Sequence, residues 1–158
     1  MGEKQNLRDV AKLFEDKLQP IQLCLFDVDG ILTDGRVFWS GDDIGYNRFF
    51  HIHDGYGLKI LAQAGIEVGI ITGGDSVGVA KRFKDLGIKH VYMGNEDKRQ
   101  AFFDVLNQTG LSEENVLYMG DEFFDLPLLK KAGFSATVPN ASYEVKESVD
   151  YITQRESG

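Results

Sequence analysis

Short apolar runs alternate along this chain with longer segments in which apolar residues recur every three or four positions. The short runs predict buried strands, and the longer segments predict helices with one apolar face. The expected strands cover 21–26, 66–71, 88–93, 115–119 and 134–138, and the expected helices cover 7–18, 76–86, 97–109 and 122–132. Strands that alternate with helices predict a parallel sheet covered by helices on both faces, so the expected fold class is α/β with a doubly wound parallel sheet.

Residues 36–50 interrupt this alternation just after the first strand. Aromatic and β-branched arms at 37–39 and 46–50 flank the turn-forming residues 40–43, which predicts a β-hairpin. A two-stranded hairpin is marginal in water by itself. We therefore expect its aromatic side chains to be buried against other subunits. Residues 54–57 predict a loop, and a further helix is expected to follow it as far as about residue 64.

The size and charge of the chain exclude several classes of protein. With 158 residues it fits one domain, 1–158, with the hairpin as its insertion and no room for a large cap. Seventeen basic and 25 acidic residues give a net charge of −8, which disfavours nucleic acid or an anionic membrane as a partner. No apolar stretch approaches a membrane span. The single cysteine, Cys24, lies in an apolar run and is expected to be a buried hydrophobe, and residues 1–6 lack a secretory signal, so a cytoplasmic setting is expected.

Polar residues follow several of the predicted strands at the point where each strand ends. Ligands of open α/β sheets bind beyond these carboxyl ends. Asp27 and Asp29 follow the first strand, Thr72, Gly73 and Gly74 follow the second, Lys98 opens the helix after the third, and Gly120 and Asp121 follow the fourth. The sequence therefore predicts a polar site at one edge of the sheet.

These residue types fit phosphoryl transfer. Clustered carboxylates repel one another unless a cation lies among them, and all-oxygen ligands favour Mg²⁺ over Zn²⁺. Asp27 can attack phosphorus to form an acyl phosphate, and Asp29 can act as a general acid toward the leaving oxygen. Thr72 with neighbouring backbone N–H groups can bind phosphoryl oxygens, and Lys98 can neutralise the charge that develops.

The same residues resemble known sequence motifs. Residues 26–35, Thr72, Lys98 and residues 120–125 resemble the four motifs of the haloacid dehalogenase superfamily. Residues 50–57, 70–74 and 115–121 resemble more closely the 3-deoxy-D-manno-octulosonate 8-phosphate phosphatase family. The similarity runs from about residue 20 to 153.

The resemblance implies a role for each matching residue. Asp27 would be the nucleophile, Asp29 the acid and base, and Thr72 and Lys98 would bind phosphate. The carboxylates of Asp27 and Asp121 and the backbone carbonyl of Asp29 would hold Mg²⁺. Glu122 and Asp125 would support these groups from behind, and the residues expected near the rest of the substrate are Gly73, Gly74, His53 and Asp54.

The resemblance also implies how the protein assembles and what it acts on. It implies a capless homotetramer in which hairpins pack together and a neighbouring subunit helps to close each site. It implies a phosphorylated sugar acid as substrate and a part in lipopolysaccharide biosynthesis. The chain departs from the family in carrying Gly74 and His53 where arginines are usual, and in lacking the family's longer tail.

Other readings remain open at this stage. The substrate could be a nine-carbon sugar acid phosphate, or the chain could be a non-catalytic oligomerisation or regulatory module. A phospho-receiver domain fits less well, because receivers lack the Asp-x-Asp-Gly motif and the hairpin. His51 and His53 could face one way, but no third metal ligand lies near them in the sequence. Asp34 is expected to cap the loop that leads into the hairpin.

Overall fold

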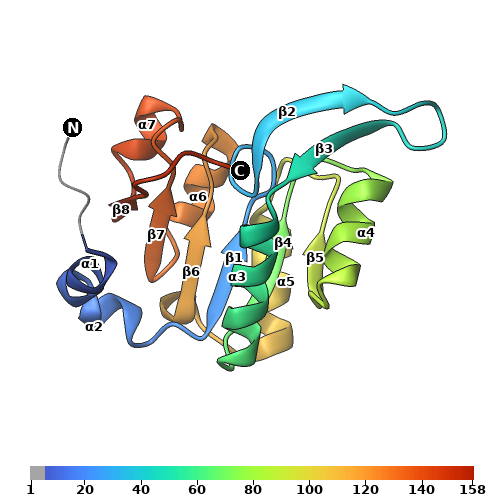
Figure 1. Ribbon diagram of the computed structural model, residues 1–158. Helices are drawn as coiled ribbons and strands as arrows, with labels where there is room; N and C mark the ends of the chain where they lie inside the picture. The colour runs from blue at the N-terminus through green and yellow to red at the C-terminus, as the bar shows by residue number, and fades with distance from the viewer. Residues whose placement is uncertain (1–5) are drawn as a thin grey trace.

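A parallel sheet of six strands, in the order β5-β4-β1-β6-β7-β8, forms the centre of the molecule (Figure 1). The computed structural model describes residues 6–158. The expectation that residues 1–6 lack a secretory signal therefore falls almost wholly outside the described residues. The strands are β1 (Leu23–Phe26), β4 (Glu67–Ile71), β5 (His90–Tyr92), β6 (Val116–Met119), β7 (Phe134–Thr137) and β8 (Tyr151–Ile152). The expectation of a doubly wound parallel sheet is confirmed.

Helices cover both faces of the sheet (Figure 1). In this view α3 crosses in front of β1 and β4, with α4 to its right, while α5 and α6 lie behind the sheet. The longer helices are α1 (Leu7–Leu13), α3 (Ile52–Gln63), α4 (Val77–Asp85) and α5 (Arg99–Thr109), and the four-residue helices are α2 (Glu15–Leu18), α6 (Leu126–Leu129) and α7 (Tyr143–Lys146). Short 3-10 turns span η1 (Glu113–Asn115) and η2 (Phe123–Asp125).

The core lies between the sheet and these helices. β1 occupies a central position and pairs with β4 and β6, which is why its side chains Leu23 and Leu25 are fully buried. Cys24 is buried as expected, and burial raises the pKa of its thiol to about 12, so it is not a nucleophile at neutral pH. None of the helices within residues 6–158 is long and apolar enough to cross a membrane.

Two helix ends show well-defined capping. Ser76 begins α4, and its side chain accepts a hydrogen bond from the N–H of Val79. Gly110 ends α5 in the left-handed conformation, with φ of 70°. The predicted helix 7–18 is divided at Phe14 into α1 and α2.

Three expectations about secondary structure are wrong. Residues 54–57 are not a loop but part of α3, which begins at Ile52 because the side chain of His51 accepts a hydrogen bond from the N–H of His53. A Cβ at Gly55 would overlap the guanidinium of Arg82, so this glycine serves close helix packing. The predicted helix 122–132 is reduced to η2 and α6, because Pro127 begins a helix more readily than it continues one. Residues 134–138 are not the last strand, since β8 follows.

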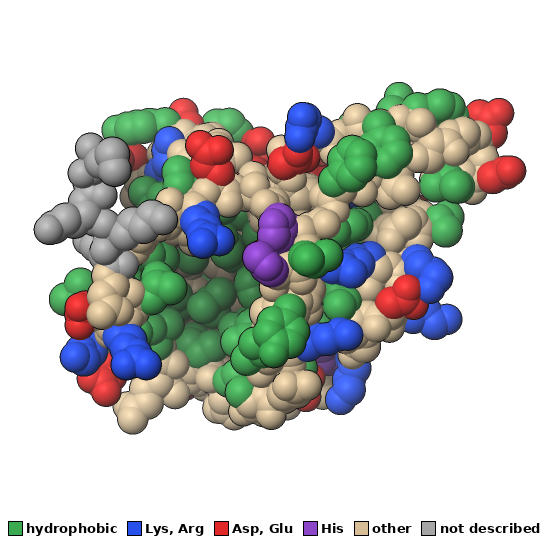
Figure 2. Space-filling model, viewed as in Figure 1, with side chains coloured by type: hydrophobic (Ala, Val, Ile, Leu, Met, Phe, Trp, Pro, Cys, Tyr) green, Lys and Arg blue, Asp and Glu red, His purple; other side chains and the backbone are tan. Residues whose placement is uncertain are grey.

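The hairpin forms a separate two-stranded sheet of β2 (Thr33–Trp39) and β3 (Tyr46–Phe50). It leaves the carboxyl edge of the main sheet and reaches over α4 (Figure 1). Phe50 at its base packs edge-on against Phe83 of α4, with ring centroids 5.7 Å apart. Beyond the base its apolar side chains are exposed and form green patches at the upper right of Figure 2.

Candidate active site

The carboxyl ends of the parallel strands surround a cavity of about 390 Å³. Of the residues predicted to form the site, the cavity brings together Asp27, Asp29, Thr72, Gly73, Gly74, Asp121 and Glu122. They arrive from three different strands, so the sheet topology is what unites them. Lys98 and Asp125 lie directly behind this lining and contact Asp27 and its surroundings.

Asp27 and Lys98 form the buried base of the cavity. The N–H of Asp27 donates to the carbonyl of Met119 at 2.9 Å, which extends the pairing of β1 with β6 by one residue. The Lys98 ammonium lies 2.8 Å from Asp27 Oδ1 and 2.7 Å from Asp125 Oδ1. Both Asp27 and Lys98 are at most 2% exposed. A buried ammonium between two carboxylates holds the Asp27 side chain in one orientation.

Asp125 is the anchor behind the site. Its Oδ1 accepts hydrogen bonds from Lys98 and from the Tyr118 hydroxyl at 2.6 Å, and its Oδ2 accepts the N–H groups of Asp121 and Glu122, each at 3.1 Å. Burial and then the Asp125 charge raise the pKa of Tyr118 well above its ordinary range, so this hydroxyl stays a donor. Asp125 therefore fixes the backbone that carries Asp121.

Three carboxylates converge closely enough to share a cation. One oxygen from each of Asp27, Asp121 and Asp125 lies within 4.8 Å of the others. Asp125 is already committed to four donors, whereas Asp121 Oδ1 is buried and has no hydrogen-bond partner. Burial raises the pKa of Asp27 to about 6, and burial with the charges of Asp27 and Asp125 raises that of Asp121 to about 7. An all-oxygen site with an unpartnered buried carboxylate oxygen fits a hard divalent cation.

Gly30 makes room for this arrangement. Its φ is 86°, which favours glycine, and a Cβ there would overlap Asp121 Oδ2. The glycine of the Asp-x-Asp-Gly motif therefore lets the loop after β1 lie directly against the second acidic loop. Gly120 has a similar place beside Asp125, where a Cβ would also overlap the carboxyl group.

The loop after β4 offers hydroxyl and N–H donors to the cavity. Thr72 is 2% exposed, and its N–H donates to the carbonyl of Tyr92 at 3.0 Å. Its hydroxyl oxygen accepts the N–H of Gly74 at 3.2 Å. The loop is thus held in a turn at the cavity wall, with Gly73 and Gly74 exposing backbone rather than side chains. Such a turn suits close approach of an anion.

Asp29 has a partner that the sequence analysis did not identify. Arg48 of β3 pairs with both of its oxygens, with Nε 2.5 Å from Oδ1 and Nη2 2.7 Å from Oδ2. Arg48 Nη1 also donates to Ser76 Oγ at 3.1 Å. The guanidinium is placed here by the pairing of β2 with β3, and no local pattern in the sequence signals that contact.

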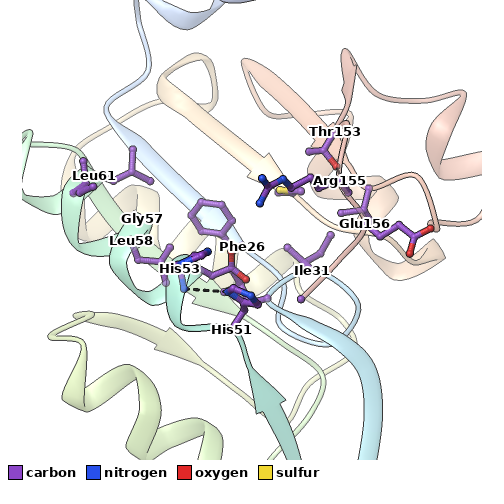
Figure 3. A pocket seen from close by; sticks show the side chains of 16 residues that line it. Phe26, Ile31, His51, His53, Gly57, Leu58, Leu61, Thr153, Arg155 and Glu156 are labelled. Carbon is purple, nitrogen blue, oxygen red and sulfur yellow. Dashed lines mark hydrogen bonds between the residues drawn. The ribbon is translucent and has the colours of Figure 1, made fainter. Parts of the chain in front are cut away.

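His53 and Asp54 are not brought to this cavity. With His51 they line a separate and mainly apolar cavity of about 540 Å³ beside α3, which also receives the segment 153–158 (Figure 3). This hollow lies below the histidines on the face shown in Figure 2. The two histidine rings are 4.7 Å apart. Within residues 6–158 the cluster of Asp27, Asp121 and Asp125 is the one group of potential metal ligands, and neither histidine belongs to it.

Comparison with known proteins agrees with this fold and site. Residues 90–157 match the family model of haloacid dehalogenase-like hydrolases. Over 144 residues, the chain is 37% identical to 3-deoxy-D-manno-octulosonate 8-phosphate phosphatase from Haemophilus influenzae, covering 91% of this chain and 79% of that protein.

Solved structures show the same relationship. The Moraxella catarrhalis 3-deoxy-D-manno-octulosonate 8-phosphate phosphatase, in complex with magnesium ion, phosphate ion and KDO, superposes with a TM-score of 0.87 at 36% identity, covering 94% of this chain and 84% of that one. The Yersinia pestis phosphatase of the same name gives a TM-score of 0.85 at 32% identity, covering 90% of this chain and 76% of that one.

A parallel sheet with an Asp-x-Asp-Gly loop after its central strand, a buried lysine and a second acidic loop defines a haloacid dehalogenase-like hydrolase. Within this class, the 37% sequence identity over 91% of the chain relates it to one phosphatase family. The chain belongs to the 3-deoxy-D-manno-octulosonate 8-phosphate phosphatase family.

Proposed function

We propose that this protein hydrolyses 3-deoxy-D-manno-octulosonate 8-phosphate as a single haloacid dehalogenase-like domain. The observation that carries the proposal is the buried Asp27 carboxylate, held by Lys98 at the base of a cavity that Asp29, Thr72 and Asp121 also line. Membership of the family supports the substrate. Of the proposed substrate-binding residues, Gly73 and Gly74 line the same cavity as Asp27, whereas His53 and Asp54 line the larger neighbouring cavity.

The reaction consists of two displacements at phosphorus. An oxygen of Asp27 attacks the phosphorus, the bond from phosphorus to the sugar oxygen breaks, and Asp29 gives that oxygen a proton. A water molecule then attacks the aspartyl phosphate, Asp29 takes the proton, and the bond from phosphorus to Asp27 breaks to release phosphate. Thr72 and the N–H groups of its loop orient the phosphoryl oxygens, while Lys98 balances the charge on Asp27.

Mg²⁺ is the cofactor of the proposal. The carboxylates of Asp27 and Asp121 and the backbone carbonyl of Asp29 would hold it, and Glu122 and Asp125 would support the acidic loop. When bound, the ion supplies positive charge that lets the phosphate approach a set of carboxylates. The unpartnered Asp121 oxygen supports this assignment.

Release of inorganic phosphate tests the proposal. The purified protein is expected to hydrolyse 3-deoxy-D-manno-octulosonate 8-phosphate with Mg²⁺ and to lose this activity in EDTA. Nine-carbon sugar acid phosphates assayed in parallel separate the two substrate classes. A preference for the nine-carbon acids would replace the named substrate, and no turnover of any phosphate ester would favour a non-catalytic module.

Metal binding should also appear in the thermal stability of the protein. The folded-state pKa values of Asp27 and Asp121 are raised, so the folded protein holds extra protons and metal-free stability falls as the pH rises from about 4 to about 7. Saturating Mg²⁺ at about 100 times its Kd should add about 2.7 kcal/mol, or roughly 5–10 °C in Tm. Melting curves should show a larger Mg²⁺ effect at pH 7.5 than at pH 5. Asp121→Asn is the control, and an undiminished Mg²⁺ effect in that variant would contradict the assignment.

A homotetramer in which a neighbouring subunit helps to close each active site is also part of the proposal. The exposed apolar side chains of the hairpin support it: Trp39 is 56% and Phe49 66% exposed, although both lie on a strand pair that needs a covering surface. Sedimentation should give a tetramer, and Trp39→Ser with Phe49→Ser should give smaller species. Leu13→Ser, which removes an even more exposed apolar side chain from α1, should leave the tetramer intact. A wild-type monomer would contradict this assembly.

The setting of the enzyme completes the proposal. A sugar acid phosphate is a charged metabolite that does not cross a membrane unaided, so we place the enzyme in the cytoplasm and in lipopolysaccharide biosynthesis. The net charge of −8 supports the absence of nucleic acid and anionic membrane among its partners.

A further inference from the structure

Arg48 is a fixed cation directly behind the wall of the phosphate cavity, where it pairs with Asp29. Its side chain is 6% exposed, and the guanidinium is held from three sides by Asp29, Ser76 Oγ and the carbonyl of Tyr46. Asp29 and Gly74, which it contacts, both line the cavity. The guanidinium lies where a Gly74 side chain would otherwise be, since a Cβ there would overlap Nη2.

The rest of the cavity is a poor place for a second anion. Carboxylates of Asp27, Asp29, Glu96, Asp121 and Glu122 line it. Lys98 lies behind Asp27 and is already shared between two carboxylates. A sugar acid brings a carboxylate in addition to its phosphate, and like charges repel strongly in a partly buried site. Among residues 6–158, Arg48 is a cation next to this lining that could turn from Asp29 to the substrate's carboxylate.

Arg48 also binds the side chain of Asp29, which the proposed reaction needs as its acid and base. Arg48 Nε and Nη2 each donate to one oxygen of Asp29, so both oxygens are held by the guanidinium, which competes with the leaving group for them while the pair persists. A sugar acid carboxylate has the same planar shape and charge as the Asp29 carboxylate and can accept the same two parallel hydrogen bonds. One guanidinium fork can serve one of these partners at a time.

We propose that Arg48 exchanges its two hydrogen bonds from Asp29 to the carboxylate of the substrate. Arg48 then determines specificity, because a carboxylate-bearing phosphate ester both gains a cation and releases Asp29 for the leaving oxygen. A phosphate ester without a carboxylate leaves the Arg48–Asp29 pair in place. The inference rests on the proposed function and adds the residue that recognises the carboxylate of the substrate.

Two phosphate esters test this exchange. 3-Deoxy-D-manno-octulosonate 8-phosphate carries the carboxylate, and D-ribose 5-phosphate offers a similar primary phosphate without one. In the wild type kcat/KM should be higher for the acid. In Arg48→Met the ratio of the two kcat/KM values should fall roughly 10- to 100-fold, as expected for loss of a charged two-point contact. Arg48→Lys should give an intermediate ratio, because it keeps the charge and loses the fork.

The control is a second arginine of the same hairpin. Arg36 pairs with Asp34 on β2 and is largely exposed, so Arg36→Met should leave the ratio unchanged. Equal loss on both esters in Arg48→Met, or no change on either, would overturn the exchange. A wild type that turns over both esters equally would overturn it too while leaving the phosphatase in place. A wild type that turns over neither would instead overturn the proposed function.

Discussion

Asp27→Asn is expected to abolish phosphatase activity, with kcat reduced by a factor on the order of 10⁴ or more. An amide nitrogen or oxygen in place of the carboxylate cannot form the acyl phosphate on which both displacements depend. The fold should survive, since the asparagine keeps an oxygen within reach of Lys98 and the N–H that pairs with Met119. Steady-state phosphate release measures the effect.

Covalent labelling sharpens this test. Acid-quenched wild-type protein should carry one phosphoryl group per active site during turnover, and the Asp27→Asn protein should carry none. Asp34→Asn serves as the control, because Asp34 lies a few residues further along the same segment and pairs with Arg36 outside the cavity. A variant at position 27 that kept appreciable turnover would assign the nucleophile to another residue.

Lys98→Met is expected to lower the free energy of unfolding by about 3–5 kcal/mol as well as to remove activity. The lysine side chain is fully buried between Asp27 and Asp125, and methionine would leave both carboxylates without their cation. That cost is a large share of the 5–15 kcal/mol that typically separates folded from unfolded states. The loss should be smaller at pH 5 than at pH 7.5, because burial already raises the pKa of Asp27 and protonation removes its charge.

An exposed ion pair of similar geometry provides the matched control. Lys81 lies 2.5 Å from Asp85 Oδ2, but both side chains are more than half exposed. Lys81→Met should therefore cost at most about 0.5 kcal/mol. Urea unfolding of both variants in EDTA measures the difference without any contribution from bound metal. Equal midpoints for the two variants would contradict the structural role of Lys98.

Strands β1, β4 and β7 were predictable from sequence because nearly all of their residues are buried and β1 and most of β4 are continuous apolar runs. Helix α3 was harder, since Gly55 and Gly57 in its first turns are typical of loops. Packing against Arg82 favours Gly55 within the helix, and that reason is visible only in three dimensions. The last strand, β8, has two residues and depends on pairing with β7, so no local periodicity marks it.

The residues of the polar site that directly follow a strand were predictable from sequence. Asp27, Thr72 and Asp121 follow strands, and parallel pairing brings strand ends together. Arg48 escaped prediction because it lies in an aromatic strand of the hairpin, and only the register of β2 with β3 aims it at Asp29. Conversely, the family resemblance placed His53 and Asp54 near the substrate, but α3 carries them to the neighbouring cavity.

The absence of a side chain at Gly74 has an evolutionary consequence. A Cβ at position 74 would overlap Arg48 Nη2 and lie 2.9 Å from Asp29 Oδ2, so a larger residue there would displace the guanidinium from its place beside Asp29. The two positions should therefore behave as one epistatic unit, in which a substitution at 74 is harmful alone and tolerated once residue 48 is shortened.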